Sequence, residues 1–277
     1  MISLIINADD LGINSERDRG ILEAFRHGIV TNASLLANGP SFDTAVEQVK
    51  TAGLPVGVHL NLSDGRALTG TIAGLTDTLG NLPGKQWLRE RLAGDDCDLA
   101  AIRAELSAQI AHVLQAGLQP DHLDGHQHCQ SYPHLTTMIT ELARQYGLNA
   151  MRSSLPAEAG DEEAQGSLAE DMTLYRRLGA RAHATIIAAG IKAPQGLWGM
   201  PLLHSLDTTR LCRLLENLPK GCWELMTHPG YPCRQGRPFE GPQRQVELRA
   251  LLSAEAREVV TRRRIRLCTF AELPCAS

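Results

Sequence analysis

Two adjacent carboxylates, Asp9 and Asp10, lie just after the apolar run from Ile2 to Ile6. An aliphatic, β-branched run that ends in Asn-Ala-Asp-Asp and a glycine predicts a buried first strand followed by a polar loop. Carboxylates at the end of such a strand can bind a metal ion or transfer protons. The alternative is that Asp10 only stabilises a turn while Asp9 faces solvent.

A second group of reactive side chains lies between residues 120 and 129, where three histidines and two aspartates fall within eight residues. Packing alone does not explain this density. In an extended strand, residues two apart share a face, so we expect Asp124, His126 and His128 to converge on one point. The pattern is typical of metal ligation or acid–base chemistry, and the alternative is a polar turn that is rich in histidine.

Single histidines lie near the ends of two further apolar runs. His59 lies in residues 55–62, and His228 follows residues 222–226. A histidine buried in a strand is more often a core residue with satisfied hydrogen bonds than a ligand. Each of these histidines therefore has an ordinary structural explanation when it is considered alone.

The elements that would position these residues alternate along the chain. Predicted strands cover residues 2–6, 29–37, 55–62, 150–152, 222–226 and 265–268; predicted helices cover residues 15–27, 41–52, 100–116, 132–146, 207–218, 243–252 and 255–263. This alternation predicts a parallel sheet with helices outside it. About seven such units predict an α/β fold, specifically a distorted or incomplete (β/α) barrel with a largely parallel sheet.

We expect residues 1–277 to form one catalytic barrel domain. Residues 63–98 are rich in Gly, Thr, Asp and Pro, and we interpret them as a long loop with a short helix around Trp87. The alternation also weakens over residues 156–206, which we interpret as an insertion that folds over one face.

A barrel gathers the carboxyl ends of its strands at one rim, where the site of such a fold is built. The residues at or just past predicted strand ends are Asp9, Asp10, His59, His126, His128 and His228. One carboxylate and two imidazoles suit a divalent metal with open positions for water. Water bound to such a metal has a pKa of about 7, and an adjacent carboxylate could take its proton. The sequence therefore predicts metal-assisted hydrolysis.

Five segments carry a resemblance to a known family. They are Asn7-Ala8-Asp9-Asp10-Leu11-Gly12, Gly28-Ile29-Val30-Thr31, Val56-Gly57-Val58-His59-Leu60, His122-Leu123-Asp124-Gly125-His126-Gln127-His128 and Met226-Thr227-His228-Pro229-Gly230-Tyr231. In this order they resemble the YdjC-like carbohydrate deacetylases, which include chitooligosaccharide deacetylases and hopanoid-associated relatives. The likeness covers nearly the whole chain and is weakest over residues 156–206. It implies a polysaccharide-deacetylase-like barrel that hydrolyses the N-acetyl group of an amino sugar.

The resemblance also implies roles for individual residues. Asp10, His59 and His126 match the metal ligands of the family, and Asp9 matches the general base. The implied cofactor is one divalent ion. The ligand types favour Zn²⁺, and Mg²⁺ is the alternative.

Further residues are expected to act around this metal. We expect His228 to protonate the leaving amine or to contact the oxyanion. Arg152, at another predicted strand end, is expected to pair with Asp9 and keep it ionised. His128 is expected to contact the substrate or a metal ligand.

Family members often carry a denser histidine run after the aspartate of this segment. In this sequence, positions 127 and 130 are Gln127 and Gln130. An amide can hydrogen-bond to a sugar hydroxyl but cannot transfer protons near neutral pH. We therefore expect Gln130 to contact the substrate, and the identity of the sugar is left open.

The composition is that of an ordinary globular protein, with 43% hydrophobic and 21% charged residues. The formal net charge of -4 gives no reason to expect a nucleic-acid or anionic-membrane partner. The seven cysteines are scattered and lack a Cys-x-x-Cys pair, which favours reduced thiols and a cytoplasmic location. No apolar segment approaches the ~20 residues that cross a bilayer. The expected partner is an acetylated amino sugar, and a homodimer is left open.

Two other classes of function compete with a deacetylase. A sugar isomerase or phosphoesterase on the same barrel would use more carboxylate ligands, a second metal or a cationic phosphate clamp, and none is evident near these strand ends. A non-catalytic sugar-binding relative is the other alternative. Such a protein has no need for the adjacent pair Asp9 and Asp10.

Overall fold

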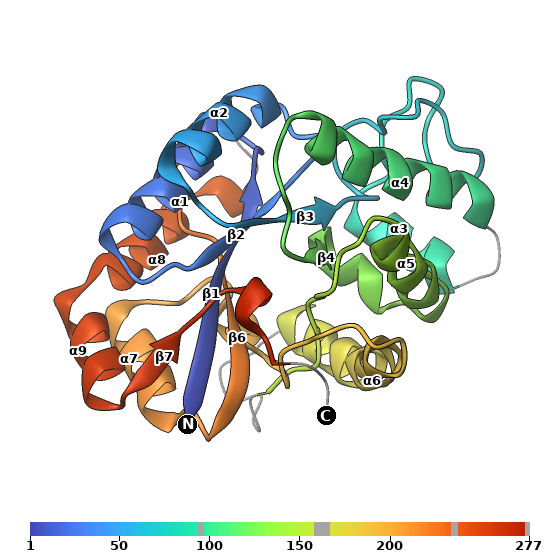
Figure 1. The fold of residues 1–277 in the computed structure, drawn as a ribbon. Helices are drawn as coiled ribbons and strands as arrows, with labels where there is room; N and C mark the ends of the chain where they lie inside the picture. The colour runs from blue at the N-terminus through green and yellow to red at the C-terminus, as the bar shows by residue number, and fades with distance from the viewer. Residues whose placement is uncertain (94–96, 158–166, 234–237, 275–277) are drawn as a thin grey trace.

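Seven parallel strands form one sheet in the computed structural model, which describes residues 1–93, 97–157, 167–233 and 238–274 (Figure 1). The strands are β1 (Ile2–Leu11), β2 (Asn32–Leu35), β3 (Val56–Leu60), β4 (Leu123–Gly125), β5 (Leu197–Trp198), β6 (Gly221–Thr227) and β7 (Ile265–Leu267). Their order is β4-β3-β2-β1-β6-β5, and β7 pairs with the first residues of β1.

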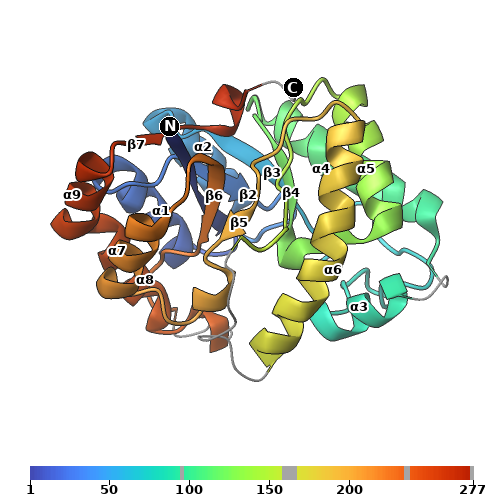
Figure 2. The same cartoon turned by 90° about the horizontal axis from the view of Figure 1, so that it is seen from below.

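The helices lie around the strands, as Figure 2 shows from below. They are α1 (Ser15–His27), α2 (Phe42–Ala52), α3 (Lys85–Ala93), α4 (Leu99–Gln115), α5 (Pro133–Gln145), α6 (Ser167–Ala188), α7 (Thr208–Asn217), α8 (Gln243–Leu252) and α9 (Ala254–Arg262). Each helix predicted from apolar spacing is present, with ends that differ by a few residues. The alternation of strand and helix therefore positions the strand ends as expected.

Strand β1 is the central element of the sheet. It pairs with β6 along Ile2–Ala8 on one side, and with β7 and then β2 on the other. Leu4, Ile5 and Ile6 have no exposed surface. A parallel strand that is covered on both faces needs such a continuous apolar run, which explains why the N-terminal sequence does not alternate.

The barrel is distorted where β4 and β5 form the two edges of the sheet. An irregular segment, residues 150–157, lies between them. Arg152 N donates to Leu123 O of β4 at 3.0 Å, and Leu197 N of β5 donates to Leu155 O at 2.8 Å. This segment pairs through isolated bridges rather than a regular strand, so the strand predicted at residues 150–152 is reduced to bridges. The predicted distorted barrel is confirmed.

The segment predicted as an insertion, residues 156–206, belongs in part to the barrel itself. Helix α6 packs on α5, and β5 adds an edge strand to the sheet through the pair Leu197 and Glu224. The prediction of an insertion over one face is therefore wrong for β5. A strand of two residues is too short to show a periodic pattern, and residues 158–166 lie outside the described part.

The long polar region after β3 contains the short helix that was predicted around Trp87, which is α3. This helix contacts α6 through one shared carboxylate: Asp171 accepts from Lys85 Nζ at 2.6 Å and from Arg89 Nη1 at 2.5 Å. Residues from two distant parts of the chain therefore meet beside the carboxyl ends of the strands. Residues 94–96 lie outside the described part.

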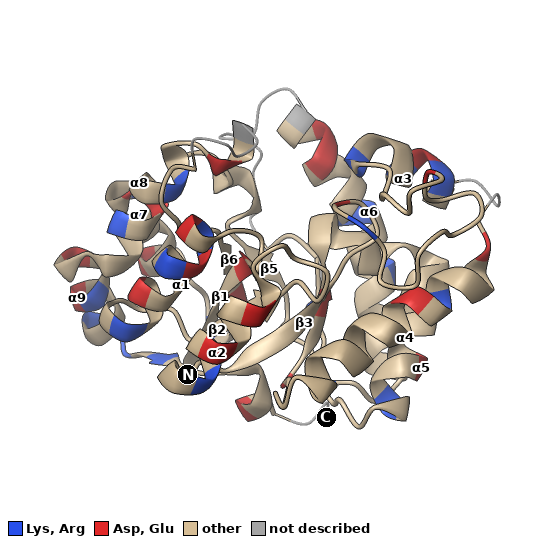
Figure 3. Ribbon diagram, turned by 90° about the horizontal axis from the view of Figure 1, so that it is seen from above, with Lys and Arg blue, Asp and Glu red and all other residues tan. Residues whose placement is uncertain are grey.

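Positions of acidic and basic residues are mixed along the outer helices, as the colours of the ribbon in Figure 3 show for α1 and α9. Among the described residues, no helix combines the length and the apolar character needed to cross a membrane.

Candidate metal centre and active site

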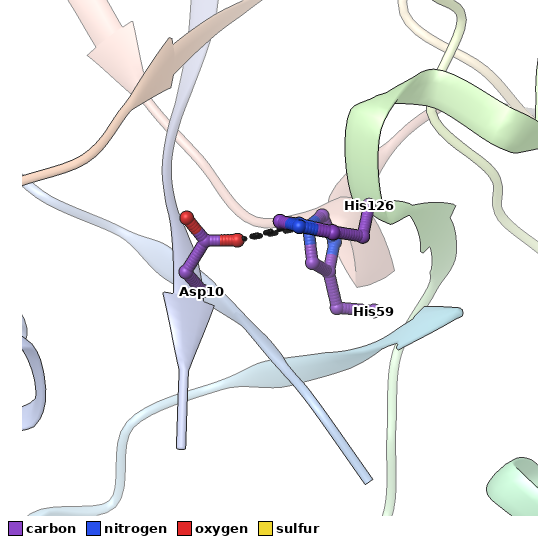
Figure 4. A group of neighbouring side chains, drawn as sticks. All are labelled: Asp10, His59 and His126. Atoms are coloured by element: carbon purple, nitrogen blue, oxygen red, sulfur yellow. Dashed lines mark ion pairs between the residues drawn. The ribbon is translucent and has the colours of Figure 1, made fainter. Parts of the chain in front are cut away.

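Asp10, His59 and His126 meet at the carboxyl end of the sheet, as Figure 4 shows. They come from the end of β1, the end of β3 and the residue after β4. Asp10 Oδ1 lies 2.8 Å from His126 Nδ1 and 3.4 Å from His59 Nε2. All three side chains are buried. The structure therefore brings together the three residues that were predicted as metal ligands.

The backbone of Asp10 is left-handed, with φ of 67°. This region disfavours residues other than glycine, but aspartate enters it more readily than most. Gly12 N donates to Asp18 Oδ1 at 2.6 Å, which fixes the turn just after Asp10. The turn also shifts the register between β1 and β2 from Ala8 to Leu11. A local strain of about 1–3 kcal/mol thus accompanies the placement of Asp10 beside the imidazoles.

Each imidazole has a further carboxylate on the ring nitrogen that faces away from Asp10. His59 Nδ1 lies 2.8 Å from Asp124 Oδ1, and His126 Nε2 lies 2.8 Å from Asp64 Oδ2. Such outer carboxylates hold a ligand histidine in one tautomer and one orientation. His59 is thereby arranged to present Nε2, and His126 to present Nδ1.

The carboxylates around the two imidazoles favour positive charge at this group. Burial alone would raise the pKa of Asp10, but its neighbours, His126 first among them, hold that pKa well below its usual value. Burial opposes protonation of the imidazoles, yet Asp124 raises the pKa of His59 to about 10 and Asp10 raises the pKa of His126 to about 9. The carboxylates thus favour two positive charges here, which a divalent cation would supply in place of the protons.

The donor set also fits a divalent cation. The Oδ1 atom of Asp10 is buried and makes no hydrogen bond, although two ring nitrogens approach it. One oxygen and two nitrogens within 4.8 Å of one another match the ligand types of Zn²⁺, and Mg²⁺ would be the harder alternative. A second set of residues, Asp9, His59 and Asp124, also converges. A guanidinium already lies between the two carboxylates of that set, so the first set is the better candidate for a cation.

That guanidinium belongs to Arg152, which clamps Asp9. Its Nη1 and Nη2 atoms donate to the two carboxylate oxygens of Asp9, each at 2.6 Å. Asn7 Nδ2 donates to Oδ1 at 2.7 Å. Since each oxygen offers two lone pairs, one lone pair of Oδ2 is left on the side of His228, whose Nε2 lies 3.9 Å away. The expected pairing of Arg152 with Asp9 is present.

Arg152 is shared by two more carboxylates. Its Nη1 lies 2.9 Å from Asp124 Oδ2, and its Nε donates to Glu224 Oε1 at 2.7 Å. Burial raises the pKa of Glu224 to about 7, against the lowering influence of Arg152. One guanidinium balances only part of the negative charge that these three carboxylates carry when they are ionised, which again favours a cation nearby.

His228 follows β6 and lines the same cavity. Its backbone N–H donates to Glu247 Oε1 at 2.8 Å, which fixes the turn after the strand. Its ring packs edge-on against Phe239, with centroids 5.2 Å apart. Burial lowers the pKa of His228 well below its usual value, and Arg244 acts in the same direction. The ring is therefore neutral at pH 7, so one ring nitrogen carries an N–H that can donate to an oxygen.

The cavity that these residues line has a volume of about 270 Å³. Tyr175, Met200 and Phe239 contribute less polar side chains to its lining. A larger groove of about 860 Å³ adjoins it, and Ile13, Asp64 and Glu240 line both. The site therefore combines a smaller pocket beside Asp10, His59 and His126 with a larger groove that continues from it.

The prediction that Asp124, His126 and His128 share one face of a strand is wrong. Strand β4 ends at Gly125, and the next residues form a 3₁₀ segment, His126–Ser131, in which Gln127 and His128 have φ of 52° and 56°. Asp124 contacts His59 and Arg152, whereas His126 contacts Asp10. A left-handed backbone is uncommon in residues other than glycine, so the conformation of Gln127 and His128 could not be predicted from their residue types.

His128 and Gln130 differ in their access to the cavity. His128 lines it, with its ring edge-on to Tyr175 and Nδ1 3.2 Å from Ser154 Oγ. Gln130 is 1% exposed and donates to the same Ser154 Oγ at 2.8 Å. Gln130 is not among the residues that line the cavity, and its contact with Ser154 suits a supporting position better than the predicted contact with the substrate.

Three further residues beside the metal ligands were not predicted: Arg17, Asp64 and Glu240. Arg17 Nη1 lies 3.4 Å from Asp10 Oδ2, and its Nη2 donates to Glu240 Oε1 at 2.7 Å. Asp64 follows the end of β3 by a few residues, so its position in the sequence could have identified it as a candidate site residue. Arg17 lies within a helix, and no feature of the sequence marks it.

Residues 3–262 match the sequence pattern of the family described as YdjC-like protein. A Mus musculus protein named carbohydrate deacetylase is 33% identical, and the alignment covers 98% of this chain and 95% of that protein. This chain belongs to the YdjC-like family. The resemblance predicted from the five sequence segments is confirmed.

Solved structures show the same fold as this YdjC-like chain. A crystal structure from Enterococcus faecalis V583, named as a candidate cellobiose-phosphate cleavage protein, has a TM-score of 0.76 at 25% identity and covers 97% of both chains. A mutant CE4 family pseudoenzyme with restored enzymatic activity has a TM-score of 0.50 at 11% identity, covering 98% of this chain and 66% of the other. The expected polysaccharide-deacetylase-like barrel is confirmed at the level of the fold.

Proposed function

We propose that this YdjC-like protein is a metal-dependent hydrolase that removes the N-acetyl group from an amino sugar. The observation that supports this proposal most directly is that the two adjacent carboxylates at the end of β1 have different partners. Asp10 Oδ1 faces the imidazoles of His59 and His126, while both carboxylate oxygens of the adjacent Asp9 accept from Arg152. The name of the Mus musculus relative, carbohydrate deacetylase, supports the same reaction class.

Asp10, His59 and His126 would hold the cation, which is Zn²⁺ or Mg²⁺. When bound, such a cation lowers the pKa of a coordinated water and polarises a carbonyl group. Asp124 and Asp64 hold the two imidazoles in the tautomers that leave Nε2 of His59 and Nδ1 of His126 for the cation.

Asp9 is proposed as the general base. Arg152 and Asn7 occupy three of its lone-pair directions, so the remaining direction of Oδ2 faces the cavity. A clamped carboxylate keeps one orientation, which places that lone pair where the attacking water must lose a proton. Asp9 would then return the proton to the amine nitrogen as the carbon–nitrogen bond breaks, which gives acetate and a free amine.

His228 is proposed to stabilise the oxyanion of the tetrahedral intermediate. A neutral imidazole is a weak acid but a good hydrogen-bond donor, and burial keeps this ring neutral. Its Nε2 lies on the Oδ2 side of Asp9, which is the side of the attacking water. Of the two predicted roles for His228, the structure favours oxyanion contact over protonation of the amine.

The sugar is proposed to lie in the enclosed cavity beside His128 and Tyr175, with longer substrates extending into the adjoining groove. Gln130 would act indirectly, because it holds Ser154, which in turn contacts His128. A cytoplasmic location is part of the proposal, since the cysteines in the described part of the chain are free thiols.

The test is to replace Asp9 with Asn in the metal-loaded protein. We expect acetate release from N-acetylated sugar oligomers to fall by about 10²–10⁴-fold, because an amide cannot take the proton. Metal content should be unchanged, since Asp9 is not a ligand. Asp77→Asn, the same exchange at an exposed carboxylate, serves as the control and should keep full activity. Full activity of the Asp9→Asn protein would overturn the assignment of the base.

A further inference from the structure

Asp64 contacts the ring nitrogen of His126 that does not face Asp10. The two nitrogens of this ring lie between two carboxylates: Nδ1 is 2.8 Å from Asp10 Oδ1, and Nε2 is 2.8 Å from Asp64 Oδ2. A neutral imidazole carries its proton on one nitrogen only. With a cation in place of the second proton, the carboxylate at Nε2 would keep the remaining proton there, which leaves the lone pair of Nδ1 for the cation.

The turn that carries Asp64 is fixed by side-chain amides. Asn61 Oδ1 accepts the backbone N–H groups of Ser63 and Asp64, each at 3.0 Å. The carbonyl oxygen of Asp64 accepts from Asn38 Nδ2 at 2.9 Å and from Asn61 Nδ2 at 2.8 Å. Asn61 and Ser63 are buried. The carboxylate of Asp64 therefore projects toward His126 from a pre-arranged loop and not from a freely moving one.

Asp124 provides the same contact for the other imidazole. It lies in β4, is fully buried and bonds to His59 Nδ1 at 2.8 Å. Asp64 thus completes a pattern in which each imidazole has one carboxylate at the nitrogen remote from Asp10. The difference is location, since Asp64 comes from the polar loop after β3 and lines both the cavity and the adjoining groove.

We infer that Asp64 is a positioning residue, which fixes the tautomer and orientation of His126 for metal binding. The inference rests on the proposed metal-dependent function. It assigns a structural task in the metal site to the long polar loop. Outer carboxylates of this kind change metal affinity by about 10–100-fold in other metal sites.

The experiment measures the affinity of the metal-free protein for Zn²⁺ and for Mg²⁺ by calorimetry, in the wild type and in two variants. Asp64→Ala removes the acceptor, and we expect the dissociation constant to rise by about 10–100-fold. Asp64→Asn keeps an amide oxygen that can accept from Nε2–H, so its dissociation constant should lie between the other two. Thermal unfolding of each metal-free protein confirms that the variants fold.

A matched control distinguishes the effect of losing the Asp64 carboxylate from the effect of any substitution in the same loop. Asp77→Ala removes another carboxylate of the same loop, which accepts from nearby Leu79 and Asn81. Its metal affinity should equal that of the wild type. Nitrogen-15 NMR of the histidines gives a second readout: in the metal-loaded wild type, the Nε2–H proton of His126 should be protected from exchange, and Asp64→Ala should abolish this protection.

The outcomes distinguish this inference from the proposed function. Unchanged affinity and an unchanged Nε2–H signal in Asp64→Ala would overturn the role of Asp64, even though the wild type binds metal. Failure of the wild type to bind either metal would instead overturn the proposed metal centre. A loss of affinity in Asp64→Ala, with partial recovery in Asp64→Asn and none in the control, supports the inference.

Discussion

Asp9 and Asp10 are neighbours in the sequence, but their carboxylates have different partners. The left-handed backbone of Asp10 directs its side chain to the two imidazoles, whereas Asp9 remains in the extended strand and meets Arg152. One turn of the chain therefore separates the proposed metal ligand from the proposed base. In our account, this separation allows a cation and a proton acceptor to operate side by side.

The role of His228 can be tested at the scale of this single residue. We expect His228→Ala to lower kcat by about 10²–10³-fold, because it removes an oxyanion donor. His228→Gln keeps an N–H donor but no group that ionises near neutral pH, so it should retain more activity than the alanine variant. Acetate release under saturating substrate measures both, with circular dichroism as the check of folding. An equal and complete loss in both variants would point to acid catalysis instead.

The residues of the site that could be predicted share one property: they lie at the ends of apolar runs. Asp9, Asp10, His59 and His228 were identified in this way. Arg17 could not be, because its partner Glu240 is 223 residues away in the sequence. A contact between distant positions leaves no periodic signal in a single sequence.

At the scale of elements, the irregular segment between β4 and β5 places Arg152. The backbone of residues 150–152 forms hydrogen bonds with β4. The side chain of Arg152 contacts carboxylates of β1, β4 and β6. The guanidinium therefore joins three strands from a segment that is not itself a regular strand. Such a segment binds the two edges of the sheet through charge as well as through backbone hydrogen bonds.

Removal of this guanidinium should destabilise the barrel. We expect Arg152→Met to lower the free energy of unfolding by about 3–5 kcal/mol, because three buried carboxylates lose their partner. Arg103→Met is the control: Arg103 pairs with Glu141 at 2.8 Å on the surface, and its loss should cost about 1 kcal/mol or less. Urea unfolding of the metal-free proteins measures both. Equal effects of the two substitutions would contradict a structural role for Arg152.

The whole molecule is a barrel whose carboxyl rim concentrates buried charge. Its alternation of strands and helices was visible in the sequence because most strands and helices are long enough to show a period. Two features were not visible. Strand β5 has only two residues, and residues 150–157 lie between the sheet edges without regular pairing. Short or irregular elements depend on tertiary contacts, so local pattern does not reveal them.

Buried charge also predicts how the stability of the whole protein depends on pH. Burial raises the pKa of Glu224 from 4.5 to about 7, so the folded state binds this proton more tightly than the unfolded state does. This contribution to stability is fully present below about pH 4.5 and is lost as the pH rises through about 7. Its size is about 3 kcal/mol.

Replacement of Glu224 by Gln should remove this dependence. We expect the free energy of unfolding of the wild type to fall, relative to Glu224→Gln, as the pH rises from about 5 to about 8. Denaturant unfolding of both metal-free proteins across this range measures the difference. Parallel stability profiles for the two proteins would show that Glu224 is ionised in the folded state throughout this pH range, which would contradict the prediction.

The central claim is that Asp10, His59 and His126 hold a divalent cation on which sugar deacetylation depends. The most direct measurement is acetate and free-amine release from N-acetylglucosamine oligomers by chelator-stripped protein, with Zn²⁺ or Mg²⁺ added back. We predict no release without metal, recovery with at least one of the two ions, and no recovery in Asp10→Asn. Full release by the stripped protein, or stoichiometric metal binding without any acetate, would contradict this account.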